Sequence, residues 1–122
     1  MKAYLIEPQL RRVTRIDLPD DGTLRDEMKR LIGANALDRI VVDNMHDSIW
    51  FDEMGFTREP CWAWRLDILY DPLPGTGIMI GADDRGRIRA PFIPLSFLQQ
   101  HIVWLDQILP QAKWQEGGHA GH

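Results

Sequence analysis

The chain is poor in the features that secreted and membrane proteins depend on. Cys61 is the only cysteine among 122 residues, so no disulfide can form within the chain, which favours a reducing compartment. No apolar run approaches the roughly 20 residues that span a bilayer. The opening Met1–Pro8 also lacks the apolar segment of a signal peptide. We therefore expect a cytoplasmic protein that does not associate with membranes.

An excess of positive charge is missing as well. Lysine and arginine number 14 against 18 aspartate and glutamate residues, which gives a formal net charge of −4 and a pI near 5.5. A mildly acidic domain is repelled by a phosphate backbone unless its basic residues gather on one face. We expect no nucleic-acid partner, and only a local basic stripe would change this.

The one glycine-rich motif does not satisfy the rules for a phosphate loop. Gly75 and Gly77 flank Thr76, and backbone N–H groups approach anions closely where side chains are absent. Such glycines bind phosphate when they follow a strand and open a helix. Here they follow a proline-rich loop and enter an apolar, strand-like run, and no Lys-Ser or Lys-Thr comes after them. The sequence favours a structural turn, with anion binding as the alternative.

Metal-binding and nucleophilic motifs are also lacking. The four histidines have no zinc-type spacing, and the acidic residues between positions 43 and 53 lack the calcium-loop pattern. Cys61 and His101 could in principle form a nucleophile–base pair, but no local motif supports the pairing, and we expect a structural thiol. We predict no metal, no cofactor and no catalytic residue.

What the chain does have is the composition of one globular domain. Hydrophobic residues make up 44% and charged residues 26% of the sequence. We expect a single domain over residues 1–110 and a flexible, polar, glycine-rich tail over residues 111–122. Alternation and β-branched residues predict strands over residues 3–6, 13–18, 37–43, 48–52, 61–69 and 77–80, with residues 37–43 as a central strand.

Two helices are predicted beside these strands. Leu24 to Ile32 has one apolar stripe, with Thr23 as the N-cap and Gly33 as the C-terminal stop. A second helix is expected from Ser96 to Leu109, and the alternative is one helical turn followed by a strand through residues 102–105. The expected fold is α+β: a mostly antiparallel sheet of about five or six strands, with one or two helices packed on a face.

Two surface features are candidates for binding. If residues 85–89 are extended, Arg85, Arg87 and Arg89 share one face, and their planar guanidinium groups suit phosphates or carboxylates. The sequence favours a solubilising, edge-protecting strand, with anion binding as the alternative. An exposed Trp50 or Trp114 would anchor a protein partner or a second copy of the chain.

The remaining tryptophans are expected in the core. Trp62 and Trp64 alternate onto the same face as Leu66 and Ile68 in the predicted strand over residues 61–69. These four side chains should therefore pack together.

Several segments resemble a family of short, functionally uncharacterised proteins from phages, plasmids and bacteria, classed as a domain of unknown function. Pro72–Gly81 is similar to its most distinctive segment, a Pro-Leu pair, two spaced glycines and an apolar strand that ends in glycine. The other similar segments are Met1–Pro8, Arg12–Thr14, Lys29–Ala34, Asp38–Val41 and Asp47–Gly55. Cys61–Trp64 and the C-terminal extension depart from the family. The resemblance implies a mobile-element context and assigns no catalytic residue.

The leading hypothesis is an accessory protein of a mobile element that binds a host or element protein through Trp50 and Trp114. The alternative is a small-molecule binding module for an anionic metabolite or nucleotide, with Arg85, Arg87, Arg89, Gly75 and Gly77 as its site. An enzyme is the third hypothesis.

Overall fold

The computed structural model describes residues 1–42, 46–69 and 71–109. The predicted tail, residues 111–122, and Trp114 lie outside this range. In chain order the elements are β1 (Lys2–Glu7), the 3-10 turn η1 (Pro8–Leu10), β2 (Arg12–Asp17), α1 (Leu24–Ile32), β3 (Leu37–Val41), β4 (Asp47–Asp52), the 3-10 turn η2 (Gly55–Thr57), β5 (Cys61–Leu66), β6 (Leu73–Pro74), β7 (Gly77–Ala82), β8 (Ile88–Arg89), α2 (Leu95–His101) and β9 (Ile102–Ile108).

The strands form two antiparallel sheets, which confirms the α+β prediction. The large sheet has the order β2-β1-β7-β4-β3, with β8 paired to β7, and the small sheet has the order β6-β5-β9. The expectation that residues 37–43 form a central strand is wrong, because β3 lies at the edge of the large sheet. The centre is β7, in which Ile78, Met79 and Ile80 are all fully buried because both faces of the strand are covered.

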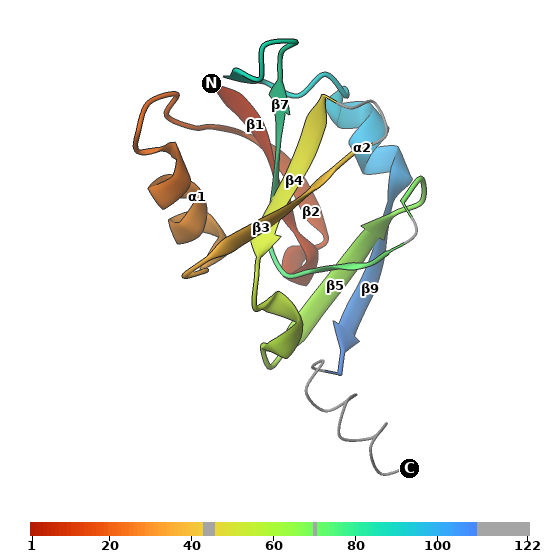
Figure 1. Cartoon of the computed structure of the whole chain (residues 1–122). Coiled ribbons are helices and arrows are strands. Elements are labelled where there is room, and N and C mark those ends of the chain that lie inside the picture. The colour runs from red at the N-terminus through yellow and green to blue at the C-terminus, as the bar shows by residue number, and fades with distance from the viewer. Residues whose placement is uncertain (43–45, 70, 110–122) are drawn as a thin grey trace, which may run out of the picture.

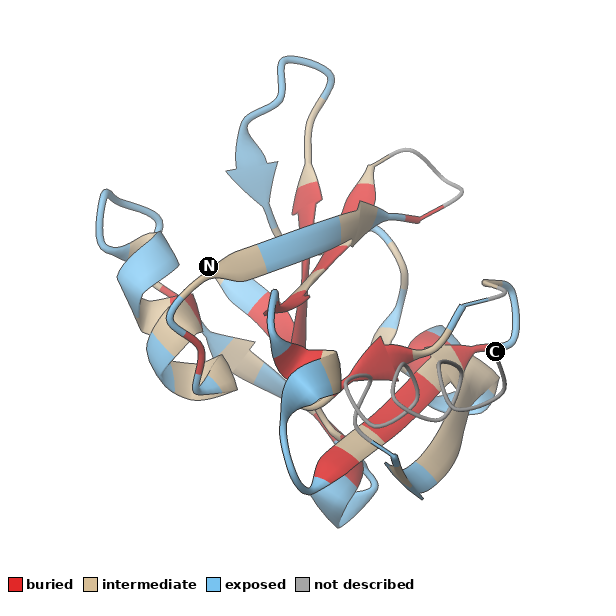
Figure 2. Ribbon diagram, turned by 60° about the horizontal axis from the view of Figure 1, so that its bottom comes forward, coloured by how far each residue is buried: buried red, intermediate tan, exposed pale blue. Residues whose placement is uncertain are grey.

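Two hydrophobic cores lie on the two faces of the large sheet (Figure 1). The inter-sheet core packs Trp64 and Leu66 of β5 against residues such as Tyr4, Ile49 and Met79 of the large sheet. The helix-side core is built by α1 and has these buried members: Ala3, Leu18, Met28, Ile78 and Ile80. Figure 2 shows the buried residues gathered on the central strands and the outer helix faces exposed. The molecule therefore has three layers.

The first helix is confirmed, and Thr23 stands at its N-cap position as predicted. Helix α1 ends at Gly33, whose φ of 78° is the left-handed conformation expected there. Thr23 makes no side-chain capping bond. Instead, its backbone N–H and its hydroxyl both donate to the Asp21 carboxylate, at 2.8 and 2.6 Å. The carboxylate is the stronger acceptor, so it orders the turn before the helix.

The predicted helix over residues 96–109 is wrong, and the alternative is confirmed. Helix α2 ends at His101, and the next residue, Ile102, begins a strand of seven residues. β-branched and aromatic residues such as Val103 and Trp104 suit a strand, and pairing with β5 satisfies its backbone. Neither helix in the described part of the chain has the length and hydropathy needed to cross a membrane.

The predicted strand over residues 61–69 is too long. β5 ends at Leu66, and Ile68 lies in the following turn with 39% of its surface exposed. Trp64 and Leu66 are buried in the inter-sheet core as expected, whereas Trp62 is only half-buried. The register of β5 shifts between Ala63 and Trp64, so Trp62 and Trp64 do not alternate as predicted, and of these two tryptophans only Trp64 belongs to the inter-sheet core.

Candidate functional site

Gly75 and Gly77 have structural roles that differ from each other. Gly75 has a left-handed φ of 64°, and its carbonyl accepts a 2.9 Å hydrogen bond from Nε1 of Trp64. At Gly77, a Cβ would lie 2.9 Å from Cζ2 of Trp64, so the missing side chain makes room for the indole ring. A strand, and not a helix, follows them. The segment therefore lacks the helix N-terminus that a phosphate loop needs.

The arginine stripe is not a single extended face. Only Ile88 and Arg89 are paired as a strand, and Gly86, with a φ of 77°, interrupts the alternation between Arg85 and Arg87. Arg87 is paired with Asp83 at 2.8 Å, and the guanidinium of Arg89 lies 3.8 Å from the centre of the Phe92 ring. Hydrogen bonds from the backbone N–H and then the side chain of Arg87 lower the pKa of the Asp83 carboxyl. Two of the three arginines therefore have local partners.

The stripe and the glycines also lie at opposite ends of β7. Six residues of β7 separate Gly75 from the turn that carries Arg85 (Figure 1). An extended strand of this length spans about 20 Å. One ligand of ordinary size cannot contact both groups, so the predicted anion site is not assembled.

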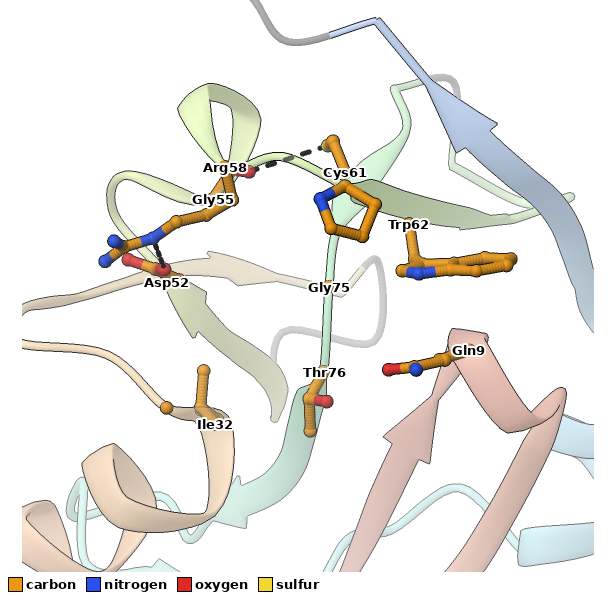
Figure 3. Close-up of a pocket in the computed structure, with 11 residues that line it drawn as sticks. Gln9, Ile32, Asp52, Gly55, Arg58, Cys61, Trp62, Gly75 and Thr76 are labelled. Atoms are coloured by element: carbon orange, nitrogen blue, oxygen red, sulfur yellow. Dashed lines mark hydrogen bonds and ion pairs between the residues drawn. The ribbon is translucent and has the colours of Figure 1, made fainter.

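A polar pocket of about 200 Å³ does lie beside Gly75. Figure 3 shows Gly75 and Thr76 between two groups, with Arg58 and Asp52 on one side and Trp62 with Gln9 on the other. A Cβ at Gly75 would meet nothing within 4 Å, so the backbone there is open to the pocket. The remaining lining residues are Ile32, Gly33, Gly55, Pro60 and Cys61. Sequence reasoning found Gly75 and missed most of its neighbours, which come from three other stretches of the chain: Gln9, residues 32–33 and residues 52–62.

The charges in the polar pocket are largely balanced. Nε of Arg58 donates to the buried Asp52 carboxylate at 2.8 Å, and the backbone N–H of Met54 donates to the other oxygen at 2.9 Å. Burial raises the pKa of the Cys61 thiol, and Sγ donates to the Gly55 carbonyl. A thiol with a raised pKa is protonated at neutral pH and is a poor nucleophile.

Cys61 and His101 do not come together. The strand register pairs Cys61 with Ile108 and pairs Leu66 with Ile102, so Cys61 and His101 lie at opposite ends of the small sheet. His101 instead contacts Asp67 at 2.8 Å and stacks on Phe97. The geometry therefore supports structural roles for Cys61 and His101, and not a nucleophile–base pair.

An apolar groove of about 300 Å³ opens between the edges of the two sheets. Its apolar lining combines β3, β4 and η2 with the segment around β6, and consists of Ile40, Val41, Phe51, Phe56, Leu69, Pro72 and Leu73. Among the described residues of this lining, Asp71 is the one that is charged. Sequence reasoning missed the groove because it placed Ile40 and Val41 in a central strand.

The backbone of β3 is open beside this groove. The backbone N–H of Val42 donates to the Asp47 carbonyl, and the backbone N–H of Glu53 donates to the Ala36 carbonyl. These two bonds show which residue pairs of β3 and β4 are hydrogen-bonded and which are not. In such a pair every second residue directs its N–H and C=O away from the partner strand. For β3 these outward residues are Leu37, Arg39 and Val41, and within the described residues β3 pairs only with β4.

Trp50, which was predicted to anchor a partner if exposed, is half-buried. It packs against the helix-side core, and guanidinium groups of Arg25 and Arg39 lie over its ring. The exposed aromatic surface that a partner would need is therefore already occupied by two arginines.

Two acidic residues between positions 43 and 53, Asp47 and Asp52, accept hydrogen bonds from other parts of the protein. Asp47 is fully buried, and its two oxygens accept from the backbone N–H groups of Phe92 and Ile93, both at 2.8 Å. Asp43 and Asn44 lie outside the described residues. Within residues 1–42, 46–69 and 71–109, no three histidine, cysteine, aspartate or glutamate side chains are grouped to hold a metal ion.

Comparison with known proteins finds no match to this chain among family models, curated proteins or solved structures. The resemblance to short phage and plasmid proteins therefore stays a prediction. The candidate sites are interpreted from their own geometry.

Proposed function

We propose that the protein is a binding module that takes up an extended segment of a partner protein along β3, with an apolar side chain in the groove. The observation that carries the proposal is the apolar groove of about 300 Å³ directly beside an unpaired strand edge. An extended peptide gains main-chain hydrogen bonds from such an edge and specificity from a neighbouring pocket. The two features lie together on β3.

The edge offers a limited set of backbone groups. Asp38 accepts a 2.8 Å hydrogen bond from the backbone N–H of Arg39, which removes one outward donor. The N–H and C=O groups of Leu37 and Val41 remain for a peptide. A protected edge of this kind discourages unspecific strand pairing and leaves room for a short, specific one.

The charge around the groove indicates the chemistry of the partner. Asp71 lines the groove, and Asp38 alternates onto the same face of β3 as Ile40. No basic residue is part of the described lining. We therefore infer that the bound segment carries an apolar side chain next to a lysine or arginine.

A display library of random peptides tests this function because it samples many possible partner segments at once. The purified chain should enrich peptides in which an apolar residue neighbours a basic one, and their affinity should lie in the micromolar range because the contact is small. In NMR titrations the amides of Leu37 and Val41 should shift. A library that yields no common motif would contradict the proposal.

Two matched substitutions locate the site. Ile40→Lys places a charge in the groove and should abolish binding of the enriched peptides, because Ile40 alternates onto the inter-sheet face of β3 and lines the groove. Ile88→Lys is the control, because Ile88 is also an isoleucine on a short strand of the large sheet, and it is 42% exposed. Equal binding by both variants would show that the peptides bind elsewhere.

A second function is supported by the polar pocket. Its open Gly75 backbone, the Trp62 ring and the polar groups of Gln9, Thr76 and Arg58 suit a small planar ligand with a carboxylate. Its volume of about 200 Å³ is below the usual size for a nucleotide site, so a fragment-sized ligand fits better.

A thermal-shift screen with small aromatic carboxylates tests the second function. A ligand that binds only the native state raises the melting temperature. The increase should disappear in Trp62→Ala and persist in the triple variant of Arg85, Arg87 and Arg89 to alanine. If the increase in melting temperature is lost in the triple variant but kept in Trp62→Ala, the ligand binds at the arginines near β8 and not in the polar pocket.

A further inference from the structure

Two arginines from different elements hold their guanidinium groups against the same tryptophan. Arg25 lies in the first turn of α1 and Arg39 in β3, and their guanidinium carbons are 5.2 and 5.5 Å from the centre of the Trp50 ring. Arg39 stands directly opposite Trp50 in a non-hydrogen-bonded pair, where side chains approach most closely. On the other side of Trp50 lies the buried Ile78 of β7. Neighbouring strands therefore hold the indole ring in place, and two positively charged guanidinium groups lie close to it.

Neither guanidinium is neutralised. Among the described residues, no carboxylate lies within 4 Å of the Arg25 or Arg39 guanidinium. By contrast Arg30, on the same helix, is paired with Glu27. The carboxylate nearest in sequence to Arg39, Asp38, accepts from its backbone N–H. The cation–π contacts stabilise each guanidinium separately but leave the net positive charge in place.

The tryptophan adds a third donor. Nε1 of Trp50 is buried and has no hydrogen-bond partner among the described residues. Buried donors without acceptors are rare in folded proteins because the lost hydration is not replaced. An acceptor oxygen from a ligand would satisfy this group.

We propose that Arg25, Arg39 and Trp50 bind a phosphate monoester. Guanidinium groups donate paired N–H bonds that match phosphate oxygens, and a dianion balances two arginines. A tetrahedral phosphate also offers acceptor oxygens in several directions, as three donors from three elements require. Since guanidiniums cover the indole, the ligand is recognised by its charge and not by base stacking.

The site is distinct from the apolar groove. Arg39 and Trp50 lie on the helix side of the large sheet, whereas Ile40 and Phe51 alternate onto the inter-sheet side. The two proposals therefore fail or succeed independently.

NMR titration of the full chain with phenyl phosphate, at constant ionic strength set with sodium chloride, tests the site. The chain has five tryptophans, and the indole signal that is lost in Trp50→Phe is assigned to Trp50. The Trp50 indole N–H and the side-chain Nε–H signals of Arg25 and Arg39 should shift and saturate. A linear response, or the same response to added chloride alone, would overturn the proposal.

Matched variants then separate the site from general charge effects. Arg25→Gln and Arg39→Gln should each weaken binding by about tenfold or more, because each removes a charged donor. Arg30→Gln removes the same charge from the same helix, and binding should be unchanged. Equal weakening by Arg30→Gln would refute a specific site.

A phosphoserine peptide and phenyl phosphate, compared side by side, distinguish the source of the phosphate. Tighter binding of the peptide assigns the site to a phosphorylated protein, and equal binding assigns it to small phosphate esters. Binding of neither probe overturns the proposal.

Discussion

The two lateral sides of the β-sandwich, where an edge of the large sheet meets an edge of the small sheet, are built differently. On the closed side, between β2 and β9, Arg11 is paired with Asp106, and Nε2 of Gln99 in α2 lies 3.5 Å from the Val13 carbonyl. On the open side, between β3 and β6, the described lining residues are apolar apart from Asp71. One side is spanned by polar contacts between the layers, and the other is a groove.

The difference shows how one architecture both protects and exposes strand edges. An uncovered edge invites pairing with another chain, and a helix or charged side chains laid across it prevent this. Helix α2 and the Arg11–Asp106 pair serve that role on the closed side. On the open side, only the backbone N–H of Arg39 is protected, by the Asp38 carboxylate, among the outward donors of β3. Beside it lies an apolar surface of the kind that binds partners.

The largest effect is expected from removing the carboxylate that anchors the segment before α2. Asp47→Ala leaves the backbone N–H groups of Phe92 and Ile93 without their acceptor. We expect a loss of about 4 kcal/mol in the free energy of unfolding, measured by urea denaturation, because two charge-assisted bonds and a buried group are involved. The closed side should then open, and amides of α2 should exchange faster with solvent.

Asp83→Ala is the matched control for this prediction. Asp83 also accepts from two backbone N–H groups, those of Arg85 and Arg87, both at 2.9 Å, but it lies in an exposed turn. Its loss should be much smaller because water replaces the lost acceptor. Similar losses in the two variants would show that burial of Asp47 is not what matters.

Two valines on the two edge strands provide a direct comparison of the sides. Val13 of β2 is 8% exposed on the closed side, and Val41 of β3 is 48% exposed on the open side. Val13→Ala should cost about 2 kcal/mol of unfolding free energy, whereas Val41→Ala should cost less than about 0.5 kcal/mol. A loss at Val41 as large as that at Val13 would mean that the groove is part of the core and not a binding surface.

Local patterns were sufficient for most of the fold. The apolar stripe and Gly33 predicted α1, and alternation predicted the β1–β2 and β3–β4 hairpins, because neighbouring residues alone decide these features. The boundary between α2 and β9 depends on pairing with β5, which is distant in sequence. There Val103 and Trp104 are compatible with both states, so only the tertiary contact decides.

The candidate sites were harder to predict than the fold. Gly75 was identified from the glycine-rich motif around it. Gln9, Arg58 and Trp62 reach the polar pocket from parts of the chain that are distant from Gly75 in sequence, so no local pattern connects them to it. The arginine stripe was inferred from a period of two, which the left-handed Gly86 interrupts. No local signal indicates that Arg25 and Arg39 meet over Trp50, since the first comes from a helix and the second from a strand.

The smallest effect is expected at the ion pair on the closed side. The side chains of Arg11 and Asp106 are 57% and 54% exposed, so a double-mutant cycle with Arg11→Gln and Asp106→Asn should give a coupling below about 1 kcal/mol. In about 1 M salt, where charges are screened within about 3 Å, the coupling should vanish. A coupling that persists in high salt would contradict an electrostatic origin.

Backbone strain sharpens this last prediction. Arg11 and Asp106 both have left-handed backbones, with φ of 48° and 58°, which cost a residue other than glycine about 1 kcal/mol. Arg11→Gly removes the ion pair and the strain together, so it should be more stable than Arg11→Gln, which removes only the ion pair. Because both variants lack the ion pair, the order of their melting temperatures reports the backbone strain at position 11 alone. The reverse order would contradict strain at this position, since glycine would then cost more through its freedom in the unfolded chain than it gains in the folded one.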